Sequence, residues 1–200
     1  KKISHRGPDG EGKVHIPNQA LFGHRRLAVI DVDHGQQPMR SQDQRYTLVF
    51  NGEIYNYIEL AEILKKDDIS LNSSSDTEVL FQLLIKMGSK ALPYLNGMFS
   101  FIFHDSEDNS WIAARDHFGI KPLYYAECGS DLVFASEIKA ILEHPDLSVE
   151  RDDHSLQQYL SFQFCLDERT LFKKVLKVRP GHFLKGKGSQ ILKEICFWKS

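Results

Sequence analysis

No apolar run in this sequence is long enough to cross a lipid bilayer, which takes about 20 residues. The start, Lys1 to His5, leads directly into polar residues and lacks the apolar stretch of a signal peptide. Neither sign of charge dominates, since the formal net charge is -2 and acids and bases are interspersed. A basic footprint for nucleic acid and an acidic tail are both missing. We therefore expect a cytoplasmic protein without nucleic-acid or membrane partners, which leaves small-molecule chemistry or protein contacts.

Cysteine is scarce, and its spacing predicts no metal or disulfide site. Cys128, Cys165 and Cys196 are odd in number, far apart and free of any Cys-x-x-Cys pair. A glycine-rich phosphate loop is also missing, because the nearest candidate, residues 185–188, lacks the strand-to-helix context that such a loop needs. We expect neither a metal nor a cofactor in this domain.

Apolar runs and turn residues predict an α+β fold. Hydrophobic residues make up 42% of the 200 residues, enough for a sizeable core. Two hairpins are expected, 98–103 with 111–115 and 122–126 with 132–135. Further strands are expected at 21–31 and 46–50, helices at 56–66, 75–87 (ending at Gly88), 137–142 (capped by Ser136) and 155–162, an extended stretch at 170–178, and a last strand after a turn at 179–183. Antiparallel hairpins with helices before and after them indicate layers, not a doubly wound parallel sheet.

The organisation of the chain follows from one change in composition. Residues 144–153 are charged and polar, as in a linker between subdomains. We expect residues 1–143 to form the core of the domain and residues 144–200 to be the C-terminal part of the same domain.

The segment from Tyr46 to Tyr57 joins a predicted buried strand to a predicted helix. Asn56 and Glu59 fit a capping box. The residues that then recur at helical spacing are Ile54, Ile58, Ala61 and Leu64. Asn51-Gly52 is a strong hairpin signal, but the residues that follow have a helical period, so we expect no return strand to pair with residues 46–50. We interpret residues 51–53 as a turn at the junction, where N–H groups could hold an oxyanion or a carboxylate.

Three charged residues each have two readings. Ser75 and Glu78 fit a second capping box, so Asp76 is either a residue of that helix start or a functional acid. Arg25 and Arg26 lie inside an apolar strand, where a buried guanidinium needs a partner. Each arginine could form a structural ion pair or contact a ligand. Because neighbours on a strand face opposite ways, one of them could point inward.

A series of blocks follows in order along nearly the whole chain. They are His5-Arg6-Gly7-Pro8-Asp9, His24-Arg25-Arg26-Leu27-Ala28-Val29-Ile30-Asp31, Gln36-Gln37-Pro38-Met39, Phe50-Asn51-Gly52-Glu53-Ile54-Tyr55-Asn56, Ser75-Asp76-Thr77-Glu78, Leu95-Asn96-Gly97-Met98-Phe99, residues 115–124, residues 135–140 and Arg179-Pro180-Gly181-His182. Together they resemble the glutaminase domain of the asparagine synthetase family, the class II glutamine amidotransferases with an N-terminal nucleophile. So many blocks in one order make the resemblance specific.

The resemblance implies an Ntn-hydrolase-like four-layer αββα sandwich of two antiparallel sheets, with its first strand missing from this chain. It implies that Asn51 and Gly52 form the oxyanion hole of a glutaminase, the Asn51 amide and the Gly52 N–H being the donors. Arg26 would bind the α-carboxylate of L-glutamine. Glu53 and Asp76 would bind its α-ammonium. Main-chain groups of Leu27, Ala28, Val29 and Ile30 would line the same pocket.

The resemblance also implies a nucleophile that these 200 residues do not supply. In the family a terminal cysteine attacks the carboxamide carbon, with its own α-amino group as the base, whose reference pKa is about 8. Only four residues precede His5, and none of the three cysteines lies in such a context. We expect that the natural protein begins upstream of Lys1, continues into a synthetase domain that uses ATP and Mg²⁺, and that this stretch alone is inactive.

Three functions stay open. The first is the glutaminase part of an asparagine synthetase, which passes ammonia to aspartate through its synthetase domain. The second keeps the glutaminase but directs ammonia to a sugar or polysaccharide precursor. The third is a non-catalytic amidotransferase-like domain, favoured by the absent nucleophile and opposed by the complete set of glutamine-binding residues. The resemblance also allows a homodimer.

Overall fold

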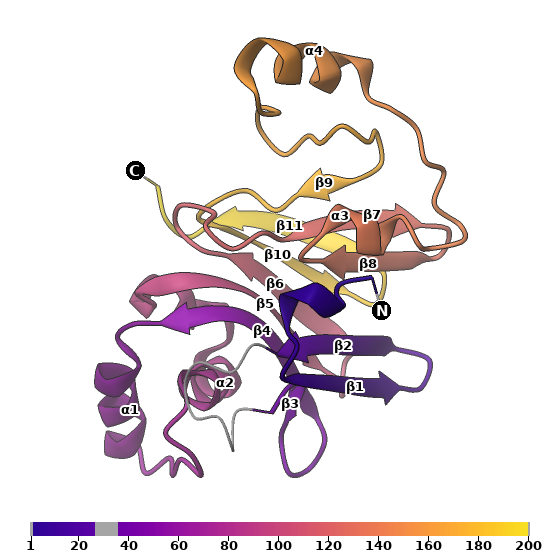
Figure 1. Cartoon of the computed structure of the whole chain (residues 1–200). Coiled ribbons are helices and arrows are strands. Elements are labelled where there is room, and N and C mark those ends of the chain that lie inside the picture. The colour runs from indigo at the N-terminus through magenta and orange to yellow at the C-terminus, as the bar shows by residue number, and fades with distance from the viewer. Residues whose placement is uncertain (1, 27–35, 200) are drawn as a thin grey trace.

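The computed structural model describes residues 2–26 and 36–199 and centres on an antiparallel six-stranded sheet (Figure 1). Its strands are β3 (Met39–Arg40), β4 (Tyr46–Ile54), β5 (Gly97–Asp105), β6 (Ser110–Arg115), β10 (His182–Lys187) and β11 (Gln190–Cys196). They lie in the order β11-β10-β6-β5-β4-β3. Strands from residues 39–54 and from residues 182–196 therefore share one sheet.

The two faces of this sheet carry different layers. On one face, α1 (Tyr57–Lys66) and α2 (Asp76–Met87) pack a core against β4, β5 and β6 that includes Leu64, Leu80, Phe50 and Phe99. On the other face lies a second antiparallel sheet, β8-β7-β9. Its strands and the helix that covers it are β7 (Tyr124–Cys128), β8 (Asp131–Ala135), β9 (Leu176–Lys177) and α3 (Ile138–Ile141).

Two smaller apolar clusters complete the layering. Trp111 and Leu184 of the large sheet pack with Leu123 and Val178, which flank the second sheet. Ile141 of α3 packs on Ala126 of β7. The order is helices, sheet, sheet, helix, so the expected αββα sandwich of antiparallel sheets is confirmed. Across the described residues, no helix combines the length and apolarity needed to span a membrane.

Strand β4 extends further than expected, and this changes the interpretation of residues 51–53. It runs to Ile54, and Asn51, Gly52 and Glu53 pair with Ser100, Phe99 and Met98 of β5. The prediction of a turn at the strand–helix junction is therefore wrong. The judgement that Asn51-Gly52 forms no hairpin is confirmed, because the pairing strand comes only after α1 and α2.

The two capping boxes predicted from the sequence have different outcomes at the starts of α1 and α2. At α2, Ser75 is the N-cap and accepts a hydrogen bond from the Glu78 N–H at 3.2 Å, and Gly88 with φ +55° ends the helix, as predicted. The return bond of the predicted capping box is replaced, because the Glu78 carboxylate accepts the N–H groups of Asn72 and Ser73. At α1, Asn56 makes no capping bond; its side chain instead bonds Tyr94 O and Asn96 N, so this predicted box is wrong. These contacts are preferred to a helix cap because they use both the N–H and the oxygen of the Asn56 amide.

Other elements differ in detail from the prediction. Strand β1 (Gly10–Ile16), which forms a ribbon with β2 (Ala20–Arg26), the strands β3 and β11, and the 3-10 helices η1 (Ser4–Arg6) and η2 (Gly88–Tyr94) add to the predicted elements. The last predicted strand is present as β10. The expected strand at 21–31 is present as β2, and its remainder lies outside the described residues. Helix α3 has Glu137 as its N-cap in place of Ser136, and α4 (Asp153–Phe162) begins after Asp152. In α1 the buried side chains are Leu60 and Leu64, whereas Ile58 is exposed.

Both predicted hairpins are confirmed by the strand pairs β5–β6 and β7–β8. The extended stretch at 170–178 is reduced to the two-residue strand β9 and an isolated bridge between Arg151 and Phe172.

Candidate functional site

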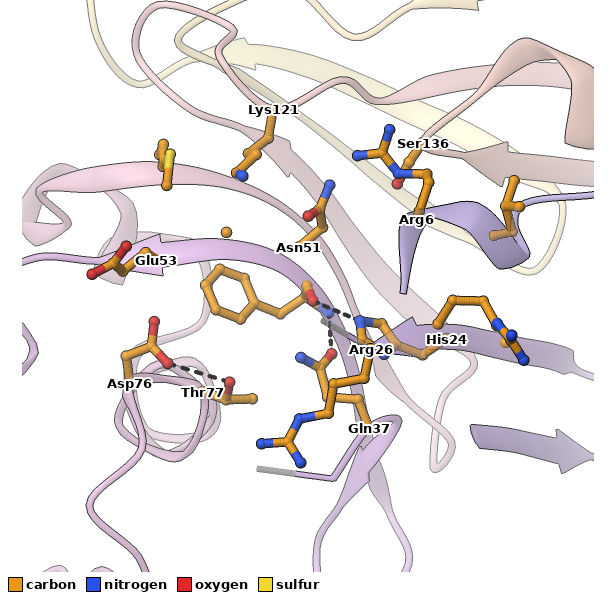
Figure 2. A pocket seen from close by; sticks show the side chains of 16 residues that line it. Arg6, His24, Arg26, Gln37, Asn51, Glu53, Asp76, Thr77, Lys121 and Ser136 are labelled. Carbon is orange, nitrogen blue, oxygen red and sulfur yellow. Dashed lines mark hydrogen bonds between the residues drawn. The ribbon is translucent and has the colours of Figure 1, made fainter. Parts of the chain in front are cut away.

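A cavity of about 270 Å³ lies along the edge of β4, between the β1–β2 ribbon and the start of α2 (Figure 2). Five of the residues proposed from the sequence line it: Arg26, Asn51, Gly52, Glu53 and Asp76. The other four proposed residues, Leu27, Ala28, Val29 and Ile30, lie outside the described residues. Chain segments far apart in sequence thus converge on one space.

The N–H of Gly52 points toward this cavity. Gly52 faces Phe99 in the β4–β5 pairing, but Phe99 uses its own N–H and C=O on its other side, where both bond Asp116. Gly52 is therefore outside the hydrogen-bonding pairs of that ladder. Two residues away in each direction, the N–H groups of Phe50 and Ile54 bond Gln37 Oε1 at 2.6 Å and Asp76 Oδ2 at 3.0 Å. Alternate residues of a strand direct N–H the same way, so the Gly52 N–H faces the space between these two side chains.

A side chain at position 52 would not fit. A Cβ built on Gly52 would lie 2.1 Å from Met98 O and 2.7 Å from the Phe99 Cα, both backbone atoms of β5. Glycine is required here by the close approach of the neighbouring strand.

The Asn51 side chain offers a second donor. Its Nδ2 atom is buried and has no hydrogen-bond partner among the described residues. In Figure 2 Asn51 points to the side of β4 that faces Lys121 and Arg6, whereas Asp76, Thr77 and Gln37 lie on the other side of the strand. A buried donor without an acceptor costs stability, so a ligand oxygen is the natural partner for it.

Two carboxylates mark one end of the cavity. Asp76, which is 5% exposed, sits in the first turn of α2, and Glu53 lies on β4 above it (Figure 2). Burial raises the pKa of the Asp76 carboxyl, and the charge of Glu53 raises it further, against hydrogen bonds from the Ile54 and Thr77 N–H groups that lower it. Two acids that repel each other in a partly dry site are stabilised by a bound cation.

The two arginines take different roles, as the alternation along a strand suggested. Arg25 also lines the cavity, but its guanidinium bonds Glu11 across the β1–β2 ribbon at 2.5 Å, an ion pair within the fold. Arg26, the last residue of β2, has its side chain beside Gln37 in the cavity (Figure 2). A guanidinium can bind a carboxylate through two parallel hydrogen bonds. The cavity thus presents separate cationic and anionic groups, which suits a zwitterion.

Several lining residues have no role in the sequence-based prediction, namely Arg6, His24, Gln37, Thr77, Met98, Lys121 and Ser136. All seven belong to the sequence blocks that carried the resemblance, and this was the only signal. Their convergence depends on strand pairing over long sequence distances. Lys121, for example, is placed by a loop in which the buried Asp116 carboxylate accepts N–H groups from Phe99, Phe118, Ile120 and Lys121.

None of the three cysteines lines the cavity. Cys128 is buried in the β7–α3 cluster, Cys165 follows α4 and bonds Ser155 O, and Cys196 ends β11. In the described part of the chain, no three His, Cys, Asp or Glu side chains gather as metal ligands. The arrangement can bind a zwitterion and stabilise negative charge on an oxygen.

A family model described as a glutamine amidotransferase domain matches residues 1–198. The chain belongs to this family. Asparagine synthetase [glutamine-hydrolyzing] 1 of Bacillus subtilis is 45% identical over 179 residues, which are 90% of this chain and 28% of that protein. Asparagine synthetase [glutamine-hydrolyzing] 1 of Saccharomyces cerevisiae is 39% identical over 149 residues, 73% of this chain and 26% of that protein. The amidotransferase domain thus spans less than a third of the relatives it matches.

The solved structures support the fold. A glutamine phosphoribosylpyrophosphate amidotransferase from B. subtilis, complexed with ADP and GMP, superposes with a TM-score of 0.68 over 99% of this chain and 45% of that chain. Its sequence identity of 22% limits the likeness to the fold. The amidotransferase domain described here therefore shares the Ntn-hydrolase architecture.

Proposed function

We propose that this domain hydrolyses the side-chain amide of L-glutamine to glutamate and ammonia. The observation that carries the proposal is the N–H of Gly52, which faces the cavity on the edge of β4, beside the buried Nδ2 of Asn51, which has no partner among the described residues. Both lie in one cavity with Arg26, Glu53 and Asp76. Arg26 binds the α-carboxylate, and the acid pair binds the α-ammonium. The amide carbonyl then lies within reach of the two donors.

The reaction proceeds by acyl transfer to a thiolate. Sulfur attacks the carboxamide carbon, the C=O electrons move to oxygen, and the Gly52 N–H and Asn51 Nδ2 stabilise the oxyanion. The amide nitrogen takes a proton, the C–N bond breaks, and ammonia leaves a thioester behind. Water attacks this thioester through a second oxyanion at the same donors, which releases glutamate and restores the thiol.

We infer that the thiol comes from a residue outside these 200. Cys128, Cys165 and Cys196 lie away from the cavity and cannot reach the amide carbon without a rearrangement of the fold. The resemblance assigns this role to an N-terminal cysteine whose α-amino group is the base. No metal or cofactor is required for these steps.

The acceptor of the ammonia is expected in a part of the longer protein outside this domain. The curated relatives are named asparagine synthetases, and the chain spans only 28% and 26% of two of them. We propose that the longer protein is cytoplasmic and delivers ammonia to a synthetase domain that activates aspartate with ATP and Mg²⁺. A sugar or polysaccharide precursor as acceptor is the alternative, and the sequence of the acceptor domain decides between them.

Measurements of glutamine binding and ammonia release distinguish the binding site in this chain from the nucleophile, which we place outside it. The 200-residue chain should bind L-glutamine but release no ammonia. The natural protein that contains it should release ammonia and glutamate in equal amounts, and should still do so with Cys128, Cys165 and Cys196 replaced together by serine. Loss of activity in this triple variant, with its fold intact by circular dichroism, would contradict the assignment.

A further inference from the structure

The edge of β4 next to the oxyanion donors is held by side chains where a neighbouring strand ends. Strand β3 pairs only with Thr47 and Leu48 of β4, and among the described residues no strand continues beyond it on that side. At Phe50 two side chains replace the missing strand. Gln37 Oε1 accepts the Phe50 N–H at 2.6 Å, and His24 Nε2 lies 3.1 Å from the Phe50 O (Figure 2).

The hydrogen bond determines which nitrogen of the His24 ring acts as the donor. A carbonyl oxygen accepts only, so Nε2 carries the proton. Burial lowers the pKa of the imidazole, and the nearby Arg26 charge acts in the same direction, against the hydrogen bond to Phe50. The neutral ring then has a lone pair on Nδ1, an atom that is buried and unpartnered among the described residues. His24 thus donates from Nε2 to one peptide carbonyl.

The contacts of His24 and Gln37 with the Phe50 backbone, here called the clasp, lie one residue before the proposed donors. Phe50 precedes Asn51, and the Phe50 C=O belongs to the peptide unit that contains the Asn51 nitrogen. On the other side of the donors, Asp76 Oδ2 accepts the Ile54 N–H at 3.0 Å. The strand edge is therefore held by side chains at residues 50 and 54, on either side of the Gly52 N–H. Any tilt of the Phe50 peptide unit would turn the Asn51 side chain and the Gly52 N–H away from the cavity.

We propose that His24 and Gln37 are positioning residues of the oxyanion hole, which act by clamping the Phe50 peptide groups and not by touching glutamine. The inference rests on the proposed glutamine hydrolysis. An oxyanion hole is effective because its donors are fixed before charge develops. Loosening the clasp should therefore lower kcat and leave ground-state binding of glutamine almost unchanged.

The kinetic test compares variants with and without the hydrogen-bonding atom, in the natural protein that contains this domain. His24→Leu and Gln37→Met remove the donor and the acceptor. We expect a fall in kcat for glutamine hydrolysis of roughly 10- to 100-fold, about 1.4 to 2.7 kcal/mol, with KM changed by less than about threefold. His24→Gln and Gln37→Glu keep a donor and an acceptor and should recover most of kcat. His15→Leu on exposed β1 and Gln157→Met on exposed α4 are the matched controls.

A second measurement is independent of turnover. In the 200-residue chain labelled with ¹⁵N, the backbone amide resonance of Gly52 should shift or broaden in His24→Leu and Gln37→Met and stay in place in the controls. An unmoved Gly52 resonance together with unchanged kcat would overturn the proposal, as would an equal loss of kcat in His24→Leu and His24→Gln. If the unmodified natural protein releases no ammonia, the proposed function fails, while the Gly52 resonance still decides whether the clasp positions this strand.

Discussion

At Asn51 the chain buries an amide donor that no described residue satisfies, which costs stability. In the proposed glutaminase this donor would stabilise the oxyanion. The neighbouring Gly52 N–H is not used by β5 for a different reason, because Phe99 directs its hydrogen bonds toward Asp116. Two consecutive residues therefore direct donors into the cavity in different ways: Asn51 through its side-chain amide, and Gly52 through a backbone N–H on the edge of β4.

Replacing Asn51 by alanine should lower kcat for glutamine hydrolysis by roughly 100- to 1000-fold, the usual effect of removing one oxyanion donor. KM should change little, since the donor interacts most strongly with the charged oxygen. Steady-state kinetics on the natural protein give both constants. The matched control is Asn18→Gly, at a turn with φ +59° where glycine fits. Equal activity in Asn51→Ala and the control would remove Asn51 from the mechanism.

The ionised Asp76 carboxylate should lower the stability of the unliganded fold while it strengthens the binding of L-glutamine. Its folded-state pKa is raised, chiefly by burial, so the folded chain takes up this proton before the unfolded chain does as pH falls. The ionised group therefore costs stability once pH rises through the folded pKa, and the unliganded chain at neutral pH carries this cost. Asp76→Asn keeps an acceptor for the Ile54 N–H without the charge.

We expect Asp76→Asn to melt at a higher temperature than the unmodified chain at neutral pH, with the difference shrinking as pH falls. Its affinity for L-glutamine should drop by roughly 10- to 100-fold, the loss of a hydrogen bond between charged groups. Thermal denaturation and calorimetry measure the two effects. Asp153→Asn, in the exposed first turn of α4, should leave glutamine affinity unchanged. Lower stability with unaltered affinity would contradict this role.

The residues of the cavity were predictable from sequence to different degrees. Arg26, Asn51, Gly52, Glu53 and Asp76 came from the family resemblance, and they do line one cavity. The resemblance gave no role to His24 or Gln37, because each contacts Phe50 through folding of distant segments. Their hydrogen bonds exist only once β2 and the segment before β3 lie against the edge of β4.

Among the elements, β4 decides the geometry of the site. Its apolar start predicted a strand, but its last four residues, Asn51 to Ile54, are held as a strand by pairing with β5. Local propensity could not reveal this, because Asn and Gly favour turns in isolation. The Asn56 cap failed for a related reason, since its amide found partners near β5. By contrast, the start and stop of α2 follow local rules and were predicted.

The closeness of β4 and β5 can be tested at Gly52. Gly52→Ala would place a Cβ 2.1 Å from Met98 O, so the strands must separate. We expect a loss of unfolding free energy of about 3 kcal/mol, at the upper end of overpacking effects. Urea denaturation of the 200-residue chain measures it. Gly23→Ala in β2, where nothing lies within 4 Å of the added Cβ, is the control and should change stability far less.

At the scale of the whole molecule, the αββα layering brings the β1–β2 ribbon, β4 and α2 around one cavity. The fold could be anticipated from the family resemblance and the two hairpins, while the order of strands in the large sheet could not. Pairing of β10 with β6 joins residues 182–187 to residues 110–115, a contact that no local pattern encodes. The division of the chain at residues 143 and 144 stays a prediction.

If this cavity recognises glutamine as a zwitterion, calorimetry on the 200-residue chain should distinguish L-glutamine from analogues that lack one of its two charges. The ligands are L-glutamine, glutaramic acid, which lacks the α-ammonium, and 4-aminobutanamide, which lacks the α-carboxylate. We predict one molecule of L-glutamine bound per chain and a loss of affinity of roughly 10-fold or more for each analogue. In Arg26→Ala, L-glutamine and 4-aminobutanamide should bind with similar affinity. Equal binding of all three ligands to the unmodified chain, or no binding of L-glutamine, would contradict the account.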